Sequence, residues 1–348
     1  MKTNLQKILK GTFAFLVIAA VLLTYIVYNQ VYSNNVKLNG KKTFYLFIAT
    51  GSNFNAVLDT LSVHKILLNE KSFIRVAELK KYVKKIKPGR YEIKSGMSNN
   101  EILNMLRVGN QKPINLIFNS IRTKGELAGK IANQLEFDSL SLITLLNDKN
   151  YLKSLGFDPN TVISMFIPNT YQMVWNTTAD KFVTRMNREY NKFWTPEREK
   201  KLKSLKMNKL QVSTLASIVQ AEQSVRNDEK PKVAGLYINR LRKRMLLESD
   251  PTIVYAIGDF SIRRVLNRDK EIESPYNTYK YAGLPPGPIN LPEISSIDAV
   301  LNYENHNYIF MCAKDDFSGY HYFSDNLSQH NIYARRYQIA LNNRDIKR

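Results

Sequence analysis

A long apolar stretch near the start dominates the pattern of hydrophobic and polar positions. No charged residue interrupts positions 11–28. At about 1.5 Å of rise per residue, a helix over this stretch spans about 27 Å, close to the hydrocarbon thickness of a bilayer. Lys2, Lys7 and Lys10 precede it and favour an inside N-terminus. We therefore expect a transmembrane anchor over 11–28, a cytoplasmic N-terminus over 1–10, and the rest of the chain outside the cytoplasm.

Two other interpretations of this stretch are open. A buried core helix would rarely be so uniformly apolar. A cleaved signal peptide has an apolar region of about 7–15 residues that ends at a small-residue site. Val31-Tyr32-Ser33 offers such a site, although it lies beyond the apolar run. Whether residues 1–33 are retained therefore stays open, but an anchor and a signal peptide both place most of the chain outside the cytoplasm.

Short apolar elements and turns alternate over residues 29–112. The stretch 29–40 is polar and rich in asparagine, which predicts a linker. Beyond it, apolar spacing predicts strands at 43–48 and 91–93 and helices at 53–61, 71–86 and 99–106. Together these elements predict a small α+β domain over 41–112.

The pattern changes again near residue 208. Before that point we expect a strand over 114–118, a helix over 124–135 and basic helices over 178–206, and we interpret 113–208 as a connecting region. After it, turns rich in Gly, Pro and Asn separate short apolar runs. Residues 209–348 are therefore expected to form the core of a second, larger domain. The fold class predicted for the whole chain is α+β.

The charge balance narrows the choice of partners. The chain carries 51 Lys and Arg against 30 Asp and Glu, a net charge of +21. Such a surface attracts nucleic acid, anionic lipid or another anionic polymer. An extracytoplasmic location argues against nucleic acid and leaves membrane lipid and an anionic polymer. Cys312 is the one cysteine, so no internal disulfide can form.

A single carboxylate stands out as a candidate acid. Residues 209–223 have helical spacing, and Leu215, Ile218 and Val219 form a stripe that Glu222 continues. Apolar surroundings disfavour the charged form, so the pKa of Glu222 should rise, as a general acid near neutral pH requires. The alternative is that Glu222 ends the helix and turns to water. Gln220 should point away, about 200° round the helix.

Other polar residues in the second domain are candidates for binding. Arg240 lies on an otherwise apolar helix face, so it needs either a buried partner or an open groove. Asp250 precedes Pro251 and is a good helix cap, which is the alternative to a binding role. Residues 274–292 are rich in Pro, Gly, Tyr and Asn, a composition typical of a rigid loop that binds sugars.

Other chemistries find no support in the sequence. The chain has 4 histidines, and none has the spacing of a metal motif. The sequence contains neither a glycine-rich phosphate loop nor a Gly-x-Ser-x-Gly elbow. We therefore expect no metal and no cofactor.

Six motifs follow one another in the second domain. They are Leu215-Ala216-Ser217-Ile218-Val219 with Glu222, Tyr237-Ile238-Asn239-Arg240-Leu241, Ser249-Asp250-Pro251-Thr252 with Tyr255, Tyr276-Asn277-Thr278-Tyr279, Gly283-Leu284-Pro285-Pro286-Gly287-Pro288-Ile289, and His330-Asn331. In order and spacing over about 209–331 they resemble the YceG-like endolytic murein transglycosylases, and the match is weak over 113–165.

The resemblance implies a membrane-anchored lytic transglycosylase, a carbon–oxygen lyase. Its domain at 41–112 would be LysM-like, and its α+β catalytic domain would cleave the MurNAc–GlcNAc bond of nascent strands. Glu222 would be the catalytic acid and base, and the products would carry 1,6-anhydro-MurNAc ends. The substrate-binding residues expected on the same basis are Arg240, Asp250, Tyr255, Asn277, Thr278, Tyr279, His330 and Asn331.

Location and partners follow from the same resemblance. The protein would be a single-pass protein of the plasma membrane with its catalytic domain outside. Its partners would be peptidoglycan glycan strands, membrane lipid and, by family analogy, peptidoglycan synthases, but no nucleic acid. The sequence departs from the family at Gln220, where a glutamate is usual, and at Gln223, where threonine is frequent.

Two rival functions fit parts of the sequence. The first is a non-catalytic anchor protein that binds the cell wall. The second is a muramidase, which uses water and needs a second carboxylate that faces Glu222. Asp250 is the one candidate for that carboxylate.

Overall fold

The computed structural model describes residues 2–344 of the chain. It divides into two compact units. Unit 1 comprises Met1–Asn115, Gln134–Glu136 and Gln172–Thr177, and unit 2 comprises Leu116–Asn133, Phe137–Tyr171 and Thr178–Arg348. Both units mix helices with short strands, so the predicted α+β class is confirmed at this level.

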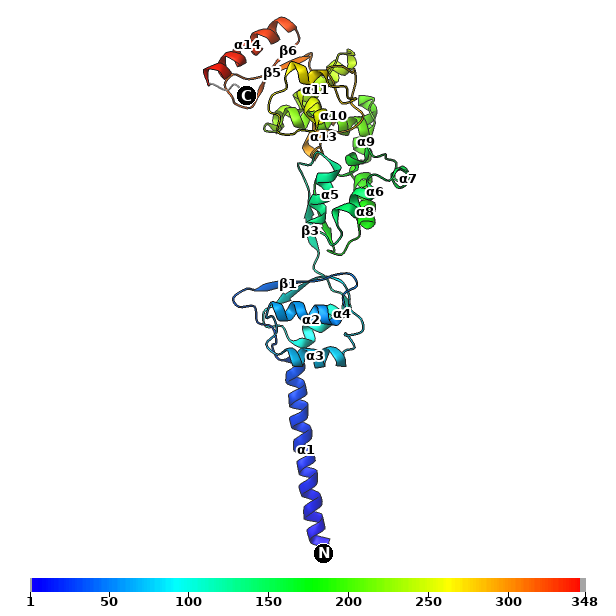
Figure 1. The fold of residues 1–348 in the computed structure, drawn as a ribbon, viewed down its shortest axis with the longest axis vertical. Helices are drawn as coiled ribbons and strands as arrows, with labels where there is room; N and C mark the ends of the chain where they lie inside the picture. The colour runs from blue at the N-terminus through cyan, green and yellow to red at the C-terminus, as the bar shows by residue number, and fades with distance from the viewer. Residues whose placement is uncertain (1, 345–348) are drawn as a thin grey trace. The chain divides into compact units, whose positions relative to one another are not determined.

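The chain begins with a single long helix, α1 (Lys2–Tyr32), which Figure 1 shows as one continuous ribbon. Within it, Lys7–Tyr32 is long and apolar enough to cross a membrane, and none of its most apolar window is buried in the protein. Signal sequences share these properties. The helix extends past the predicted span of 11–28 in both directions, and no proline interrupts it.

The stretch predicted as a linker, 29–40, belongs instead to the folded part of unit 1. Val36 and Leu38 are buried in its core. Asn35 is also buried, and its amide donates to Asn69 O at 3.0 Å and to Asn99 Oδ1 at 2.6 Å. Asparagine amides that satisfy buried polar groups look the same in the sequence as asparagines in a solvated linker.

Unit 1 contains a two-stranded antiparallel sheet with helices packed against it. Strands β1 (Thr43–Ile48) and β2 (Gly89–Lys94) pair in a register that places Leu46 opposite Tyr91. The helices are α2 (Phe54–Val63), α3 (Glu70–Leu79) and α4 (Asn99–Val108). Helix α3 ends earlier than the predicted residue 86, because Lys81 takes the left-handed conformation and turns Tyr82 into the core. No comparison confirms the LysM-like label for this unit.

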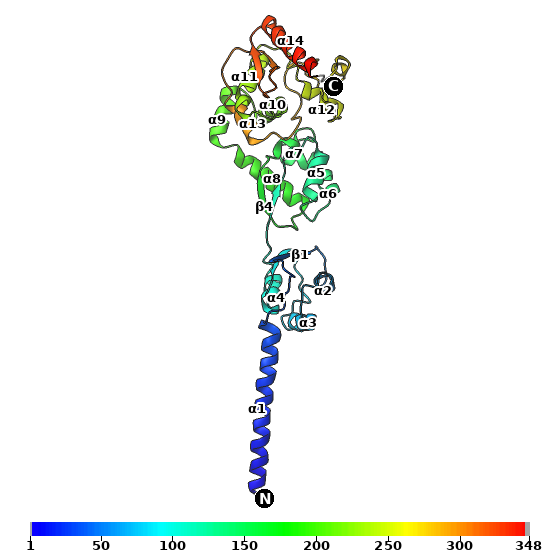
Figure 2. The same ribbon diagram turned by 90° about the vertical axis from the view of Figure 1, so that its left-hand side faces the viewer.

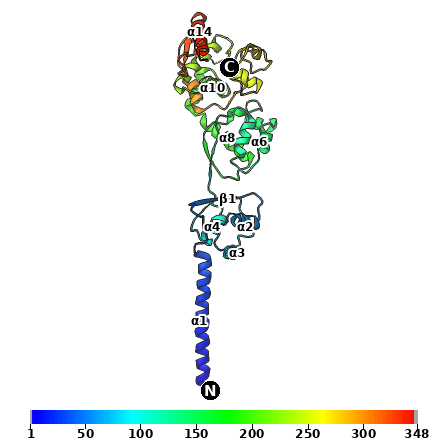
Figure 3. The same cartoon turned by 60° about the vertical axis from the view of Figure 1, so that its left-hand side comes forward.

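Unit 2 is mainly helical. The remaining elements of the chain are β3 (Ile114–Ile117), α5 (Lys124–Ala132), α6 (Ser139–Leu145), α7 (Lys149–Ser154), η1 (Val162–Met165), β4 (Thr170–Met173), α8 (Ala179–Phe193), α9 (Pro196–Leu205), α10 (Lys209–Glu222), η2 (Asn227–Glu229), α11 (Lys230–Arg242), α12 (Asp250–Ile257), η3 (Asn267–Glu271), α13 (Ile294–Leu301), β5 (Phe310–Ala313), β6 (His321–Ser324) and α14 (Leu327–Asn343). Strands β3 and β4 each contain residues of both units. Helix α6 packs against α8 (Figure 3).

Helix α10 is the central element of unit 2. Every residue from Val212 to Val219 is buried, and the helix packs against both α11 and α13 (Figure 2). One of its small polar side chains joins α10 to a distant loop: Ser217 Oγ donates to Thr214 O at 2.7 Å and accepts from Ile289 N at 3.0 Å. A helix whose middle turns are buried is a rigid base for a side chain at its end.

The predicted boundary at residue 208 does not separate two compact bodies. Most of 113–208 belongs to the same unit as 209–348. For example, α9 contacts α13, and Arg198 forms a bidentate ion pair with Asp298, with Nη2 3.1 Å from Oδ1. Contacts between residues so distant in sequence leave no trace in local composition.

Candidate active site

Glu222 is the last residue of α10, and its carboxyl group is held rather than solvated. Tyr237 Oη donates to Glu222 Oε1 at 2.7 Å, and Ser249 Oγ donates to the same oxygen at 2.6 Å. Within residues 2–344, Oε2 has no hydrogen-bond partner in the structure. The alternative in which Glu222 turns out to water is therefore wrong. Oε2 is the oxygen that remains available to carry a proton.

The surroundings of Glu222 favour its protonated form. Burial raises its pKa above the ordinary value, and the nearby Asp250 carboxylate raises it further, against the opposing hydrogen bonds from Ser249 and Tyr237. The carbonyl end of α10 also disfavours a negative charge at this position. Burial keeps the pKa of Tyr237 well above its usual range, so its hydroxyl retains its proton and donates.

The loop predicted to bind sugar acts on the Glu222 carboxyl indirectly, through Ser249. Thr278 Oγ1 accepts from Ser249 N at 3.0 Å and lies 2.8 Å from Thr252 Oγ1. Asn277 donates to Lys270 O and Ile272 O, both at 2.8 Å. Asn277 and Thr278 are 0% and 2% exposed. In this structure Thr278 holds Ser249 in place and Asn277 holds the backbone of its own loop, whereas substrate binding by either residue stays a prediction.

Arg240 finds the buried partners that its position in the sequence requires. Its guanidinium donates to Ile309 O at 2.6 Å, to Leu246 O and Leu247 O at 3.0 Å, and to Glu248 Oε2 at 2.8 Å. These bonds tie α11 to the segment before α12 and to the start of β5. Arg240 is 6% exposed, so its main role here is structural and the expected substrate contact is not supported.

A hollow of about 480 Å³ opens at Glu222. The sequence-predicted residues that line it are Glu222, Arg240, Asp250, Tyr279, His330 and Asn331. Asp250 is exposed as the first residue of α12 rather than its cap, and its Oδ1 accepts from Tyr279 Oη at 2.6 Å. His330 stacks on Phe310 with ring centroids 5.2 Å apart, and burial lowers its pKa.

Tyr255 lies in a neighbouring hollow of about 550 Å³. Its ring packs on Tyr276, with centroids 4.7 Å apart. Asp250 lines both hollows, and Gln220 lines only the second. The two hollows therefore meet at Asp250, one with Glu222 on its wall and one without.

Sequence reasoning missed several residues of this site. Tyr237 and Ser249 hold Glu222, and His321 lines its hollow. His321 is in turn held by Glu229, with Nδ1 2.7 Å from Glu229 Oε2. Tyr237 and Ser249 stand within recognised motifs, but the sequence shows only that they are present and not that they point to Glu222. No sequence signal links His321 to Glu229.

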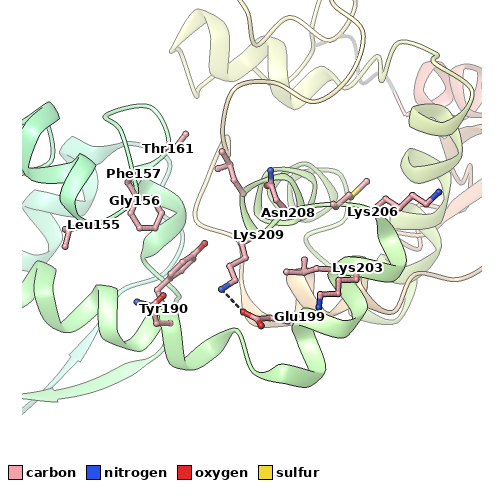
Figure 4. A pocket seen from close by; sticks show the side chains of 14 residues that line it. Leu155, Gly156, Phe157, Thr161, Tyr190, Glu199, Lys203, Lys206, Asn208 and Lys209 are labelled. Atoms are coloured by element: carbon pink, nitrogen blue, oxygen red, sulfur yellow. Dashed lines mark ion pairs between the residues drawn. The ribbon is translucent and has the colours of Figure 1, made fainter.

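Another hollow of unit 2 lies between α8, α9 and the start of α10 (Figure 4). It measures about 590 Å³ and is mostly apolar, with Phe157 and Tyr190 on its wall. Lys209 forms an ion pair with Glu199 at 2.9 Å there. Glu222 does not line it, so size alone does not identify the reactive site. Among residues 2–344, no cluster of three or more His, Cys, Asp or Glu side chains is arranged to hold a metal ion.

Comparison with known proteins shows which family the chain is similar to. The model of the YceG-like family matches residues 46–336. An endolytic murein transglycosylase of Bacillus subtilis (strain 168) is 29% identical over 327 residues, which cover 88% of each chain. A protein of the same name from Streptococcus pneumoniae (strain D39) is 26% identical over 328 residues, and this chain spans 58% of its length. The crystal structure of a YceG-like protein from Listeria monocytogenes is 27% identical, with a TM-score of 0.57 over 84% of this chain and 99% of that one.

Proposed function

We propose that this chain, which belongs to the YceG-like family, cleaves peptidoglycan glycan strands as an endolytic lytic transglycosylase. The relatives from Bacillus subtilis and Streptococcus pneumoniae carry the name endolytic murein transglycosylase. The observation that carries the proposal is the half-buried carboxyl of Glu222. Two hydroxyl donors hold one of its oxygens, and the residue lines a hollow.

The proposed reaction uses Glu222 as its acid. Oε2 carries the proton and transfers it to the glycosidic oxygen between MurNAc and GlcNAc, and the C1–O bond breaks through an oxocarbenium-like state. Tyr237 and Ser249 stabilise the carboxylate that Glu222 becomes, because charge-assisted hydrogen bonds are stronger than neutral ones. The 6-hydroxyl of the same MurNAc attacks C1 and closes the 1,6-anhydro ring, and the proton that it loses restores the acid form of Glu222 by the end of the cycle.

A water-using muramidase is the second candidate. Two further carboxylates line the hollow, and both are engaged. Glu248 pairs with Arg240 at 2.8 Å, and Asp250 accepts from Tyr279. The hydrogen bond from Tyr279 occupies Oδ1 of Asp250 and leaves its Oδ2 without a partner among residues 2–344. It remains the group that would activate a water in a muramidase.

Product analysis separates these functions. The detergent-solubilised full chain is incubated with isolated glycan strands, with Glu222→Gln as the control, and the fragments are weighed by mass spectrometry. Anhydro ends, lighter by one water, support the transglycosylase. Reducing ends support the muramidase. If the protein binds glycan but releases no fragment, it is a cell-wall-binding anchor protein and both enzymatic proposals fail.

The remaining features fit a protein of the cell surface. We propose that α1 anchors the protein in the plasma membrane, with its N-terminus inside and both units outside. The helices and strands over 41–112 would form a LysM-like domain that binds glycan. Membrane lipid and peptidoglycan synthases are the proposed partners besides the glycan itself.

A further inference from the structure

A buried carboxylate and a histidine form a pair beside Glu222. Glu229 is 7% exposed and accepts from His321 twice, from its backbone N at 2.9 Å and from Nδ1 at 2.7 Å. Gln223 Nε2 also donates to Glu229 Oε2. Gln223 is itself 2% exposed, so the pair is enclosed on this side. Such an arrangement fixes both the position and the orientation of the imidazole ring.

The charge on Glu229 determines which ring nitrogen carries the proton. Burial alone would raise the pKa of Glu229, but the hydrogen bonds from His321 and Gln223 outweigh it, and the pKa lies below its ordinary value. Glu229 is therefore an ionised carboxylate at neutral pH and only accepts hydrogen bonds. Nδ1 of His321 must donate to it, which leaves the lone pair of a neutral ring on Nε2.

His321 is part of the wall of the hollow of Glu222. Its Nε2 has no hydrogen-bond partner among residues 2–344. A positive charge on His321 acts on Glu222: against the dominant effect of burial, it lowers the pKa of that carboxyl. Besides Glu222, the same wall carries the titratable groups Arg240, Glu248, Asp250, His330, Tyr237, Tyr279 and Cys312, of which Arg240 and Glu248 pair with each other.

We propose that His321, oriented by Glu229, is a second proton-transfer group of this site. The inference rests on the proposed transglycosylase function. As the MurNAc 6-hydroxyl attacks C1, the new C1–O6 bond forms and the O6 proton passes to Nε2 of His321. In the same step Glu222 gives its proton to the leaving oxygen, and the C1–O bond to GlcNAc breaks.

The cycle closes without an external reagent. The imidazolium of His321 returns one proton to the Glu222 carboxylate, directly or through a water in the hollow, and both groups regain their starting states. Two separate groups allow one oxygen to gain a proton while the other loses one. General acid–base assistance of this kind contributes about 10²- to 10⁴-fold in rate.

The test is chemical rescue in the full-length protein. His321→Ala should lower kcat on isolated glycan by about 10²- to 10⁴-fold, and added imidazole should restore activity in proportion to its unprotonated fraction. His64→Gln, in the other unit, should behave like the wild type and show no imidazole effect. A folded His321→Ala protein that keeps wild-type activity, or that loses activity which imidazole does not restore, overturns the inference.

A second variant covers the case in which His321→Ala does not fold. Glu229→Gln keeps an acceptor for Nδ1 but removes the negative charge, which disfavours the protonated ring. The acidic limb of the kcat profile should then move to lower pH. A uniform loss at every pH would indicate support of the fold only and would reject the proposed role. If the wild type itself releases no anhydro fragment, the proposed function fails, whereas an active wild type with an unaffected His321→Ala variant rejects His321 alone.

Discussion

Ser249 directs its hydroxyl to Glu222 Oε1, at 2.6 Å, and leaves helix α12 without a side-chain cap. A serine at this position normally bonds the backbone of the first turn, and loss of such a cap costs about 1 kcal/mol. Ser249 is fully buried, and its backbone N is fixed by Thr278. The local stability of α12 is therefore reduced at the residue that orients the candidate acid, as is common at functional sites.

Substitution of the acid itself is the first prediction. Glu222→Gln should abolish glycan cleavage, because the amide cannot donate a proton to the leaving oxygen. The fold should persist, since the amide oxygen still accepts from Tyr237 and Ser249. Cleavage is followed by chromatography of released fragments, and folding by circular dichroism. Substantial activity in the purified variant would remove Glu222 from the mechanism.

The same substitution should stabilise the protein in a manner that depends on pH. Burial raises the folded-state pKa of Glu222 above its unfolded value. The carboxyl therefore favours the folded state at pH values below the unfolded pKa, and that contribution is lost as the pH rises through the folded pKa. Glu222→Gln does not titrate, so its free energy of unfolding relative to wild type should increase from acidic to neutral pH. Urea titrations at both pH values measure this, and a difference independent of pH contradicts the raised pKa.

Substitutions of Ser249 and Asp250, two neighbours of Glu222, should shift the alkaline limb of the profile of kcat against pH in opposite directions. Ser249→Ala removes a hydrogen bond that lowers the pKa of Glu222, so the active protonated form should persist to higher pH. Asp250→Asn removes a negative charge that raises this pKa, so the limb should move to lower pH. Profiles of kcat against pH decide the point. Ser213→Ala, a buried serine on α10 away from the carboxyl, is the matched control.

The local pattern was sufficient to predict that Glu222 lies at the end of an apolar helix, but it did not predict the residues that bond its carboxyl group. Its place at the end of an apolar helix follows from spacing within α10 and from the surrounding motif. Tyr237 and Ser249 lie 15 and 27 residues further along the chain, and His321 lies 92 residues beyond Glu229. Only the packing of α10, α11, α12 and β6 brings them together. The spacing of apolar residues in a single sequence does not reveal contacts between elements so far apart in the chain.

The sequence also could not show what the buried polar side chains bond to, for the same physical reason. Asn277 and Thr278 stand in a loop rich in Pro, Gly and Tyr, which resembles a ligand-binding surface. In the structure their side chains satisfy buried backbone groups. Asn35 does the same in the stretch predicted as a linker. Sequence shows a hydrogen-bonding side chain but not whether its partner is a ligand, water or the protein's own backbone.

The replacement of the family's usual glutamate by Gln220 should have little effect on activity. Its Oε1 accepts from Glu293 N at 2.5 Å and from Ser296 Oγ at 3.1 Å, at the start of α13, and its Nε2 donates to Leu291 O at 3.3 Å. Gln220→Glu places a carboxylate at a helix N-terminus, which favours negative charge.

We therefore expect kcat of Gln220→Glu to change by less than tenfold, or about 1.4 kcal/mol of barrier. Gln220→Leu is the informative companion, because it removes the acceptor and should lower the unfolding midpoint while Glu222 stays in place. A larger change in kcat for Gln220→Glu would show that this position communicates with the hollow of Glu222.

The final prediction concerns α1 as a membrane anchor. Residues 11–28 are apolar and exposed along the helix, whereas its last turn is tied to unit 1 through Gln30 O, which accepts from Asn99 Nδ2 at 2.8 Å. A truncated chain that begins at Asn29 keeps this contact and should remain folded, soluble and active on isolated glycan. In cells it should fail to replace the full-length protein, because a tether raises the effective concentration of enzyme at newly made strands beside the membrane. An unrelated transmembrane helix joined before Asn29 should restore function. In the proposal, α1 only fixes where the protein is located and makes no sequence-specific contact in the bilayer. Full complementation by a secreted, unanchored chain, or a mature N-terminus after Ser33, would contradict the anchor.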